Sequence, residues 1–409
     1  MMENNRAILD KNDEYHIDKE IADLFNNKDL KTSSDKEKRK MIKETISGVL
    51  DDLKILITSR DQDSLIEKKY REVFGLGPLQ CLVEDCEVTE IMVNGPYGVF
   101  IEKKGKLRKT DIVFSDMAKV KNMVDRIINP LGLRLDISSP IVDGRLKDGS
   151  RINAVISPIC KEGISVTIRK FNKDILGLDD LIRLGTIDEE VADFLKLCVR
   201  NKKNIIVSGA TSTGKTTFLN LLTSLIVDDE RLVTVEETLE LDLRQENLVR
   251  LESRPANLEG EGAITLKDLI RNSLRMRPDR IIIGEIRGPE AVDVLQAMNT
   301  GHEGSMTTVH ANSSRDMISR METMLLMSGI NLTPLSARMI ISSAIDLIIQ
   351  LKKDSSGRRI VSNIGHLRDS REDKGLGHDL NISDIFFYDR YKRKLVPSSY
   401  LNIFLDRSL

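Results

Sequence analysis

The chain has 409 residues, of which 40% are hydrophobic and 31% charged, and its formal net charge is −2. This balance is typical of a globular chain of two or three domains, and it lacks the basic excess of nucleic-acid-binding domains. The chain shows neither an apolar signal at its start nor an apolar run near the roughly 18 residues of a spanning helix, so we expect a cytoplasmic protein with no direct membrane span and no nucleic-acid partner.

Residues 1–74 are expected to form a helical, partly disordered N-terminal segment. Apolar residues recur near every 3.6 positions in 37–59, which predicts an amphipathic helix, and a second helix follows at 62–73. The polar stretch before them predicts at most one short helix, at 17–26. A turn-rich GLGP at 75–78 ends the segment.

A small α+β domain is expected next, over 75–171. Its strands are separated by Asn-Gly-Pro and Lys-Gly turns, and its one helix stops before Pro130. The expected elements are strands at 86–95, 97–105 and 107–114, a helix at 116–129, a hairpin at 142–158 and a closing strand at 164–171.

From residue 188 onward, strands and helices alternate. Such alternation predicts a largely parallel sheet covered on both faces. The expected helices are 188–200, 214–226, 265–276, 289–299, 313–328 and 333–344, and the expected strands are 204–208, 231–236, 248–252, 280–284 and 304–309. A β-rich tail follows from 345 to 409.

The run GATSTGKTT fits the phosphate-loop pattern G-x-x-x-x-G-K-[ST], between an apolar strand and a helix, which is the context this motif needs. Its glycines let backbone N–H groups converge on phosphate oxygens at a helix N-terminus. The guanine-specific N-K-x-D pattern is absent from the sequence, so ATP is the expected nucleotide. We expect Lys215 to bridge the β- and γ-phosphates and Thr216 to hold Mg²⁺. The nucleotide-binding residues predicted are Gly209, Ala210, Thr211, Ser212, Thr213, Gly214, Lys215, Thr216 and Thr217.

Acidic residues stand at the ends of two predicted strands that follow the loop. Glu285 comes just past Ile281–Ile283, and the pair Glu236 and Glu237 stands at the end of the earlier strand at 231–236. Carboxyl ends of parallel strands line the ligand crevice in open α/β sheets, so one carboxylate there can orient or deprotonate water while another holds a metal-bound water. The alternative is that each acid merely caps its strand.

Positive charge is needed to stabilise a transferring phosphoryl group. Arg145 and Arg151 lie on the predicted hairpin of the smaller domain, and Arg169 lies on its closing strand. Three arginines on neighbouring strands predict a basic face that closes over nucleotide, although any one of them alone is more often a surface residue.

His302 and His310 flank a predicted strand in GHEGSMTTVH. No Asp, Cys or His stands at metal-ligand spacing beside them, which argues against zinc. The end of this strand should reach the same crevice, where His310 can sense the γ-phosphate. The alternative is that both are structural histidines.

The chain resembles the ATPases of type II/IV secretion systems and pilus assembly, most closely the CpaF-type motors of tight-adherence (Flp) pili. The resemblance covers roughly 75–350 and rests on VTEIMVNGP, VDGRLKDGSRINAVISP, GATSTGKTT, VTVEETLEL, RPDRIIIGEIRGPEA and GHEGSMTTVHANS. It implies a RecA-like P-loop motor domain (188–409), an N-terminal PAS-like α+β domain (75–171) and a flexible linker (172–187). It also implies a homohexamer that works at the inner membrane with platform proteins.

The resemblance assigns roles to the candidate residues. Glu236 becomes the general-base candidate and Glu285 the second catalytic carboxylate of an atypical Walker B motif. The catalytic set that it implies is Glu236, Glu285, Arg145, Arg151, Arg169, His302 and His310.

Three features depart from the family. The family's Asp box usually reads Glu-Asp rather than Glu236-Glu237, Ser212 stands where glycine is common, and the tail from 352 onward matches poorly. The expected function is an ATP-hydrolysing motor for a pilus or secretion system. The two rivals are a DNA-working P-loop motor and a non-motor module that binds ATP as a structural or regulatory ligand.

Overall fold

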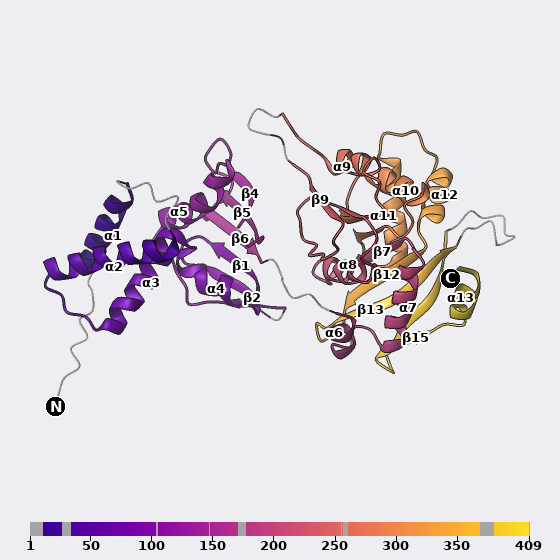
Figure 1. The fold of residues 1–409 in the computed structure, drawn as a ribbon, viewed down its shortest axis with the longest axis horizontal. Coiled ribbons are helices and arrows are strands. Elements are labelled where there is room, and N and C mark those ends of the chain that lie inside the picture. Colours follow the sequence, from indigo (N-terminus) through magenta and orange to yellow (C-terminus); the bar gives the residue numbers. More distant parts are fainter. Residues whose placement is uncertain are drawn as a thin grey trace. The chain divides into compact units, whose positions relative to one another are not determined.

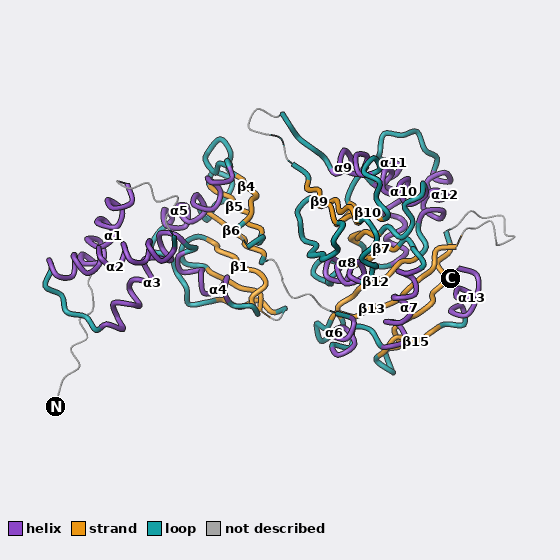
Figure 2. Tube along the Cα trace, viewed as in Figure 1, coloured by secondary structure: helices purple, strands orange, loops and turns teal. Residues whose placement is uncertain are grey.

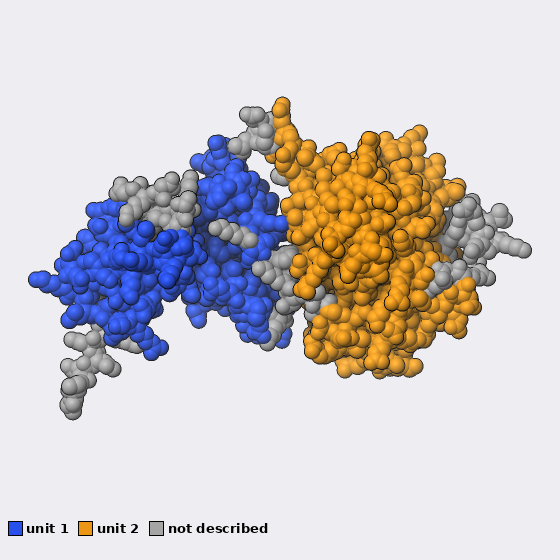
Figure 3. Space-filling model, in the orientation of Figure 1, with its two compact units in different colours: residues 1–172 blue, residues 173–409 orange. Residues whose placement is uncertain are grey.

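The computed structural model describes residues 11–26, 34–103, 105–146, 148–170, 177–254, 256, 261–368 and 380–408. The chain divides into two compact units, unit 1 at Met1–Asn172 and unit 2 at Lys173–Leu409, coloured separately in Figure 3. The expected linker at 172–187 contains residues that pack into unit 2, because Leu181 and Ile187 are buried in its core. Residues 171–176 lie outside the described residues.

Three helices open unit 1: α1 (Lys11–Asn26), α2 (Asp35–Asp52) and α3 (Ser59–Phe74). Their apolar stripes form one small core that includes Ile17, Ile42, Ile46 and Ile66. The first helix is longer than the expected 17–26 because its apolar positions Ile17 and Ile21 have α2 and α3 to pack against.

The second helix ends earlier than the expected residue 59. Lys54 adopts a positive φ of 56°, which a helix cannot continue through, and Thr58 caps α3 by accepting a hydrogen bond from the Asp61 amide. The apolar residues Ile55 and Ile57 still pack on the helical core from this connection. The apolar residues therefore keep the helical spacing beyond the turn that ends α2, and for this reason the sequence predicts a helix that is too long.

The rest of unit 1 is a six-stranded antiparallel sheet with helices packed on its core, of which α5 is the longest (Figure 2). The strand order is β3-β2-β1-β6-β5-β4. The helix α5 (Met117–Ile128) packs Val120, Met123 and Val124 on one face of the sheet. The elements are η1 (Gly77–Leu79), α4 (Gln80–Glu84), β1 (Val88–Asn94), β2 (Val99–Lys103), β3 (Lys106–Lys109), η2 (Asn129–Leu131), β4 (Ile141–Arg145), β5 (Arg151–Ile156) and β6 (Ile164–Arg169).

The expected strand at 107–114 is only partly formed. It ends at Lys109, where the Thr110 amide donates to the Val99 carbonyl, and the chain then leaves the sheet. Phe114 is buried in the core instead of extending the edge strand.

Unit 2 contains a nine-stranded mixed sheet with the order β15-β14-β13-β12-β7-β11-β10-β8-β9. The strands from β12 to β9 run parallel, and β13, β14 and β15 add antiparallel pairs at one edge. The strands are β7 (Ile205–Gly209), β8 (Leu232–Glu236), β9 (Leu248–Glu252), β10 (Arg280–Ile286), β11 (Met306–His310), β12 (Leu347–Lys353), β13 (Arg359–Arg368), β14 (Asn381–Asp389) and β15 (Lys394–Pro397).

Helices cover both faces of this sheet, as its buried strands require (Figure 1). One face packs against α6 (Leu178–Arg183), α7 (Glu189–Arg200), α8 (Lys215–Ser224) and α13 (Tyr400–Ser408). The other face packs against α9 (Leu266–Ser273), α10 (Ala291–Asn299), α11 (Ser314–Leu326) and α12 (Pro334–Ala344). Ile205 and Val207 of β7 face the first group and Ile206 faces the second, which is the alternation expected of a central strand.

Among the described residues, no helix is long and apolar enough to cross a membrane.

Candidate nucleotide-binding site

Four neighbouring parallel strands end at one edge of the unit 2 sheet. In the order β7-β11-β10-β8, their last residues include Gly209, His310, Glu285 and Glu236. His310 is the cross-strand partner of Gly209. The sheet therefore brings the phosphate loop, one predicted histidine and both predicted catalytic carboxylates to one edge, where α/β proteins bind ligands.

The phosphate loop itself has the backbone that an anion nest requires. Gly214, the N-cap of α8, has a φ of 93°, and Ser212 has a φ of 60°. A Cβ on Gly209 would collide with Thr213 Oγ1 and approach the Leu351 carbonyl oxygen to 3.1 Å, so only glycine fits there. Successive amides that alternate with left-handed residues point inward and cradle phosphate oxygens.

The side chains of the loop and of the first helical turn complete the cradle. Lys215 Nζ lies 3.2 Å from the Ala210 carbonyl oxygen, and Thr213 Oγ1 donates to the same oxygen at 2.8 Å. Thr216 and Thr217 occupy the first turn of α8, where hydroxyl oxygens suit a magnesium ion and phosphates. The loop residues thus fit a bound nucleotide.

Glu236 is the most perturbed acid of the site. Its side chain is only 2% exposed, and its Oε2 accepts hydrogen bonds from the amides of Glu240 at 2.7 Å and Leu241 at 3.0 Å. Burial raises its pKa to about 7, although the two amides and Arg250 act in the opposite direction. Among the described residues, its Oε1 has no hydrogen-bond partner. A carboxylate titrating near neutral pH, with one unpaired oxygen, is suited to take a proton from water.

Glu285 and Glu237 share a cation that the sequence analysis did not single out. Arg287 donates to Glu285 Oε2 through its Nε at 3.0 Å and its NH2 at 2.6 Å, and to Glu237 Oε2 through NH1 at 3.0 Å. Burial opposes a charged guanidinium, yet Glu285 and Glu237 together raise the pKa of Arg287. A single arginine therefore bridges the ends of β8 and β10.

His310 borders a pocket of about 520 Å³ at the same edge, lined also by Glu285, Arg287 and Arg320. Burial, followed by the nearby Lys215 and Arg320, lowers the pKa of His310, which keeps its imidazole neutral at pH 7. Arg320 NH1 donates to the His310 carbonyl oxygen at 2.5 Å and holds the end of β11 in place.

His302 lies at the opposite end of β11 from His310, in the turn that precedes the strand. Its carbonyl oxygen accepts from Ser305 Oγ at 2.7 Å, and its buried Nδ1 has no partner among the described residues. Within one chain, the structure does not bring His302 to the edge that carries the phosphate loop. The five-residue strand β11 separates the two histidines.

The three predicted arginines of unit 1 stand in one row across its sheet. Arg145 pairs with Arg151 between β4 and β5, Arg151 pairs with Arg169 between β5 and β6, and Arg169 pairs with Glu90 of β1. Directly paired residues point to the same face, with Cβ atoms about 4.5–5.5 Å apart. Their neighbours Ile152 and Ile168 are buried toward α5, so the arginines occupy the opposite face. A row of like charges in register is suited to a polyanion.

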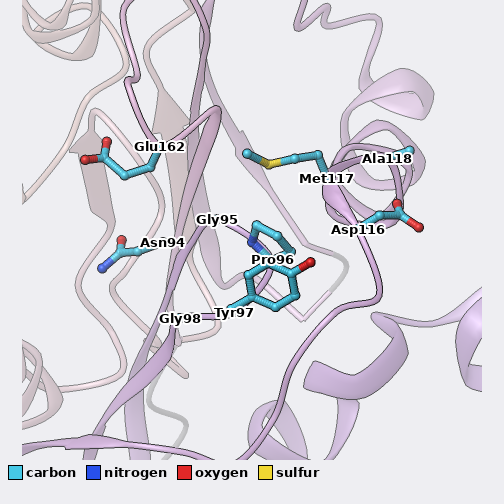
Figure 4. Close-up of a pocket in the computed structure, with 9 residues that line it drawn as sticks. All are labelled: Asn94, Gly95, Pro96, Tyr97, Gly98, Asp116, Met117, Ala118 and Glu162. Atoms are coloured by element: carbon cyan, nitrogen blue, oxygen red, sulfur yellow. The ribbon is translucent and has the colours of Figure 1, made fainter.

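A separate shallow pocket lies at the other end of β1 and does not include the arginine row. Figure 4 shows Pro96 and Tyr97 in its turn, with Met117 extending toward it from the start of α5. Gly163, beside Met117, has a φ of 88°, which favours glycine there. Its lining is mainly apolar and offers no convergent charges for a phosphate.

The fold and the site define a mixed α/β protein with a phosphate loop at the edge of a largely parallel sheet. Two solved structures share its fold: the ATPase DotB of Legionella pneumophila, with a TM-score of 0.52 and 20% identity over 79% of this chain and 81% of that one, and the pilus retraction motor PilT with bound ADP, with a TM-score of 0.50 and 17% identity over 80% and 84%. These likenesses show the fold alone: a mixed α/β chain with a helical N-terminal segment.

Sequence relatives point to a family. The model of the type II/IV secretion system protein family matches residues 72–375. A Mycobacterium tuberculosis protein named for conjugal transfer is 36% identical over 303 residues, which span 73% of this chain and 86% of the relative. The type IV secretion system protein VirB11 of Bartonella henselae is 30% identical over 316 residues, 68% of this chain and 88% of the relative. The chain belongs to the type II/IV secretion system protein family.

Proposed function

We propose that this chain is an ATP-hydrolysing motor that powers assembly or retraction of a type IV-like pilus or secretion system, and that its nearest functional type is the CpaF-type motor of tight-adherence pili. The observation that supports this most is the convergence of Gly209, His310, Glu285 and Glu236 on one sheet edge. Membership of the secretion family and the ATPase names of its structural relatives agree with it.

In this proposal, the loop 209–217 holds the triphosphate through its amides and Lys215. A magnesium ion bound with the nucleotide would neutralise phosphate charge, and Thr216 and Glu285 supply the oxygens to hold it directly or through water. Glu236 takes the proton of the attacking water at Oε1, which the fold leaves unpaired among the described residues. With a pKa of about 7, Glu236 is basic enough to accept a proton from water and is still partly ionised near neutral pH.

The arginine row of unit 1 supplies the remaining positive charge. Arg145, Arg151 and Arg169 reach the γ-phosphate, from the same chain or from a neighbour in a homohexamer, and release it after hydrolysis. The difference between a gripped and a released phosphate then becomes a movement between units. Such a ring would work from the cytoplasm against inner-membrane platform proteins. Within one chain, His302 lies at the other end of β11 from the phosphate loop and therefore has no role in this scheme.

The proposal is tested by nucleotide binding and turnover of the purified full chain. Wild type should bind ATP and release phosphate, Lys215→Ala should lose both, and Glu236→Gln should bind ATP but turn it over at least about 100-fold more slowly. Equal turnover of wild type and Lys215→Ala would refute the assignment.

A second candidate function, a motor that works directly on DNA, is favoured by one observation, the conjugal-transfer names of several relatives. The near-neutral charge of the chain opposes it, because DNA motors line their channels with Lys and Arg. The two are separated by the rate of ATP hydrolysis with and without single-stranded DNA. Strong stimulation that falls with salt would support the DNA motor, and an unchanged rate would support the secretion motor.

A further inference from the structure

Arg359, the first residue of β13, contacts the phosphate loop from the divergent C-terminal tail. Its Nε donates to the Ser212 carbonyl oxygen at 3.3 Å. Its Cδ lies 3.3 Å from the position that a Cβ on Gly214 would occupy. Ser212 and Gly214 are the two left-handed residues of the loop, so this one side chain lies against the strained part of the nest.

The contact with Ser212 also orients an amide. The Ser212 carbonyl and the Thr213 N–H belong to one trans peptide plane, so they point in opposite directions. An arginine that holds the carbonyl on the outer side of the loop turns the Thr213 N–H away from itself, toward the inner side, where the phosphate nest lies. A hydrogen bond from a charged donor is stronger than one from a neutral donor and constrains the plane accordingly.

The main chain of the same residue is fixed to the first part of unit 2. Thr186 Oγ1 donates to the Arg359 carbonyl oxygen at 3.0 Å, and the Val361 amide donates to the Thr186 carbonyl oxygen at 3.2 Å. Thr186 is 8% exposed and follows α6, the first described element of unit 2. Arg359 therefore joins the phosphate loop to the segment through which the chain enters from unit 1.

Neighbouring residues make this junction rigid on the α6 side. Gly185 has a φ of 68°, and a Cβ added to it would lie only 2.9 Å from Arg358 NH1, so the Arg358 side chain packs closely against this turn. Arg358 is itself held by Asp354 at 3.2 Å and by the Tyr388 hydroxyl at 2.8 Å. The anchor at Thr186 is buried and bonded, whereas the Arg359 side chain is exposed and able to follow the loop.

We propose that Arg359 is a positioning residue that orients the Thr213 amide for phosphate and transmits occupancy of the loop, through Thr186, to the α6 segment. This inference rests on the proposed function, because it requires a nucleotide in the loop. When phosphate draws on the Thr213 amide, the peptide plane is fixed, the Arg359 contact is strengthened, and the Thr186 hydrogen bonds are strengthened with it.

The inference is tested by amide hydrogen exchange of the full chain, alone and with saturating ADP or the nonhydrolysable analogue AMP-PNP. In wild type, nucleotide should slow exchange both in 209–217 and in 178–187. Arg359→Ala should weaken ADP binding by about three- to tenfold, an effect of the size of one charge-assisted hydrogen bond. At saturating nucleotide, amide exchange in this variant should still be slowed in 209–217, but nucleotide should no longer slow exchange in 178–187.

Matched variants separate positioning from general damage. Lys353→Ala removes the same charge from the cross-strand partner of Arg359 and should behave as wild type. Arg359→Lys, which keeps the charge but changes the donor geometry, should recover part of the affinity. Thr186→Val removes the hydroxyl donor from the other end. It should also abolish the change in 178–187, and it should weaken ADP binding less than Arg359→Ala does, because the Arg359 contact with the loop remains.

Each outcome bears on a distinct claim. If Arg359→Ala binds ADP as wild type does, or still shows the nucleotide-dependent change in 178–187, the inference is wrong. If wild type binds nucleotide without any change in 178–187, the transmission fails while the proposed function stands. If wild type binds no nucleotide, the proposed function fails and the inference falls with it.

Discussion

The side chain of Glu236 packs against the backbone of Gly284 on the adjacent strand. A Cβ at residue 284 would lie 3.2 Å from Glu236 Cγ and 3.7 Å from its Oε2. The Gly284 carbonyl oxygen is held in turn by Thr308 Oγ1 at 2.8 Å, from the strand on the other side. The absence of a side chain at Gly284 therefore leaves the space that the proposed catalytic carboxylate of Glu236 occupies.

This contact predicts the effect of Gly284→Ala. The added methyl group must displace Glu236, because the strand cannot move without breaking the Thr308 contact. Overpacking of this kind costs about 1–3 kcal/mol of stability. Turnover should fall at least about tenfold through loss of alignment with water, while the affinity for ADP changes little. Thermal melting, phosphate release and ADP titration measure the three quantities, and wild-type turnover in a folded variant would contradict the placement.

The raised pKa of Glu236 predicts how stability depends on pH. In the unfolded chain this group ionises near 4.5, whereas in the folded chain its pKa is about 7. Between these values the folded chain holds a proton that the unfolded chain has lost, so this group makes stability fall as pH rises, and the loss is complete above about pH 7. Gln carries no such proton.

The free energy of unfolding of Glu236→Gln relative to wild type should therefore rise by about 3 kcal/mol between about pH 4 and about pH 8. Denaturant titrations of both chains at several pH values measure it. A difference that does not change with pH would show that Glu236 has an ordinary pKa.

The left-handed backbone of Ser212 predicts a stabilising change. A residue with a Cβ at a φ of 60° costs roughly 1 kcal/mol relative to glycine. Ser212→Gly should therefore raise the free energy of unfolding by about 0.5–1 kcal/mol, and Ser212→Ala should not. Equal stabilities of the Gly and Ala variants in urea titrations would mean that the loop is not strained at this residue.

The arginine row predicts a loss of catalysis without a loss of binding. Arg151 is the middle member, paired with Arg145 on one side and Arg169 on the other. Arg151→Gln should lower kcat by roughly 100-fold or more, because a cation that stabilises the transferring phosphoryl group is worth that much. The affinity for ADP, which the loop of unit 2 determines, should stay within about threefold. Lys109→Gln, on β3 of the same sheet, serves as the control; an Arg151→Gln chain as active as this control would count against the row.

Much of the site follows from the sequence because parallel strands impose it. Acids at the carboxyl ends of parallel strands must lie at one edge of the sheet, and the loop between β7 and α8 must lie there too. The placements of Glu236, Glu285 and His310 at this edge needed only strand assignment and chain direction. Their catalytic roles stay predictions.

The residues that escaped prediction depend on contacts distant in sequence. Arg287 acts through Glu237, 50 positions away, and Arg359 contacts Ser212, 147 positions away. Each looks like a surface arginine until the sheet order is known. The pairing of β12 with β7, which brings the tail beside the loop, has no signal in the local sequence.

Where the predicted end of a helix is wrong, the cause is local. The predicted helix extends beyond Asp52 because Ile55 and Ile57 are apolar and pack on the same core as α2. The helix itself ends because Lys54 has a positive φ. Periodicity reports which residues are buried, and it does not report where the backbone turns.

The central claim is that the arginine row of unit 1 contacts a triphosphate bound on residues 209–217. A structure of the full-length assembly with AMP-PNP tests this most directly. We predict the γ-phosphate beside Lys215 and the Glu236 carboxylate, with at least one of Arg145, Arg151 and Arg169, from the same or a neighbouring chain, within hydrogen-bonding distance. Nucleotide bound with all three arginines out of reach in every subunit would contradict the account.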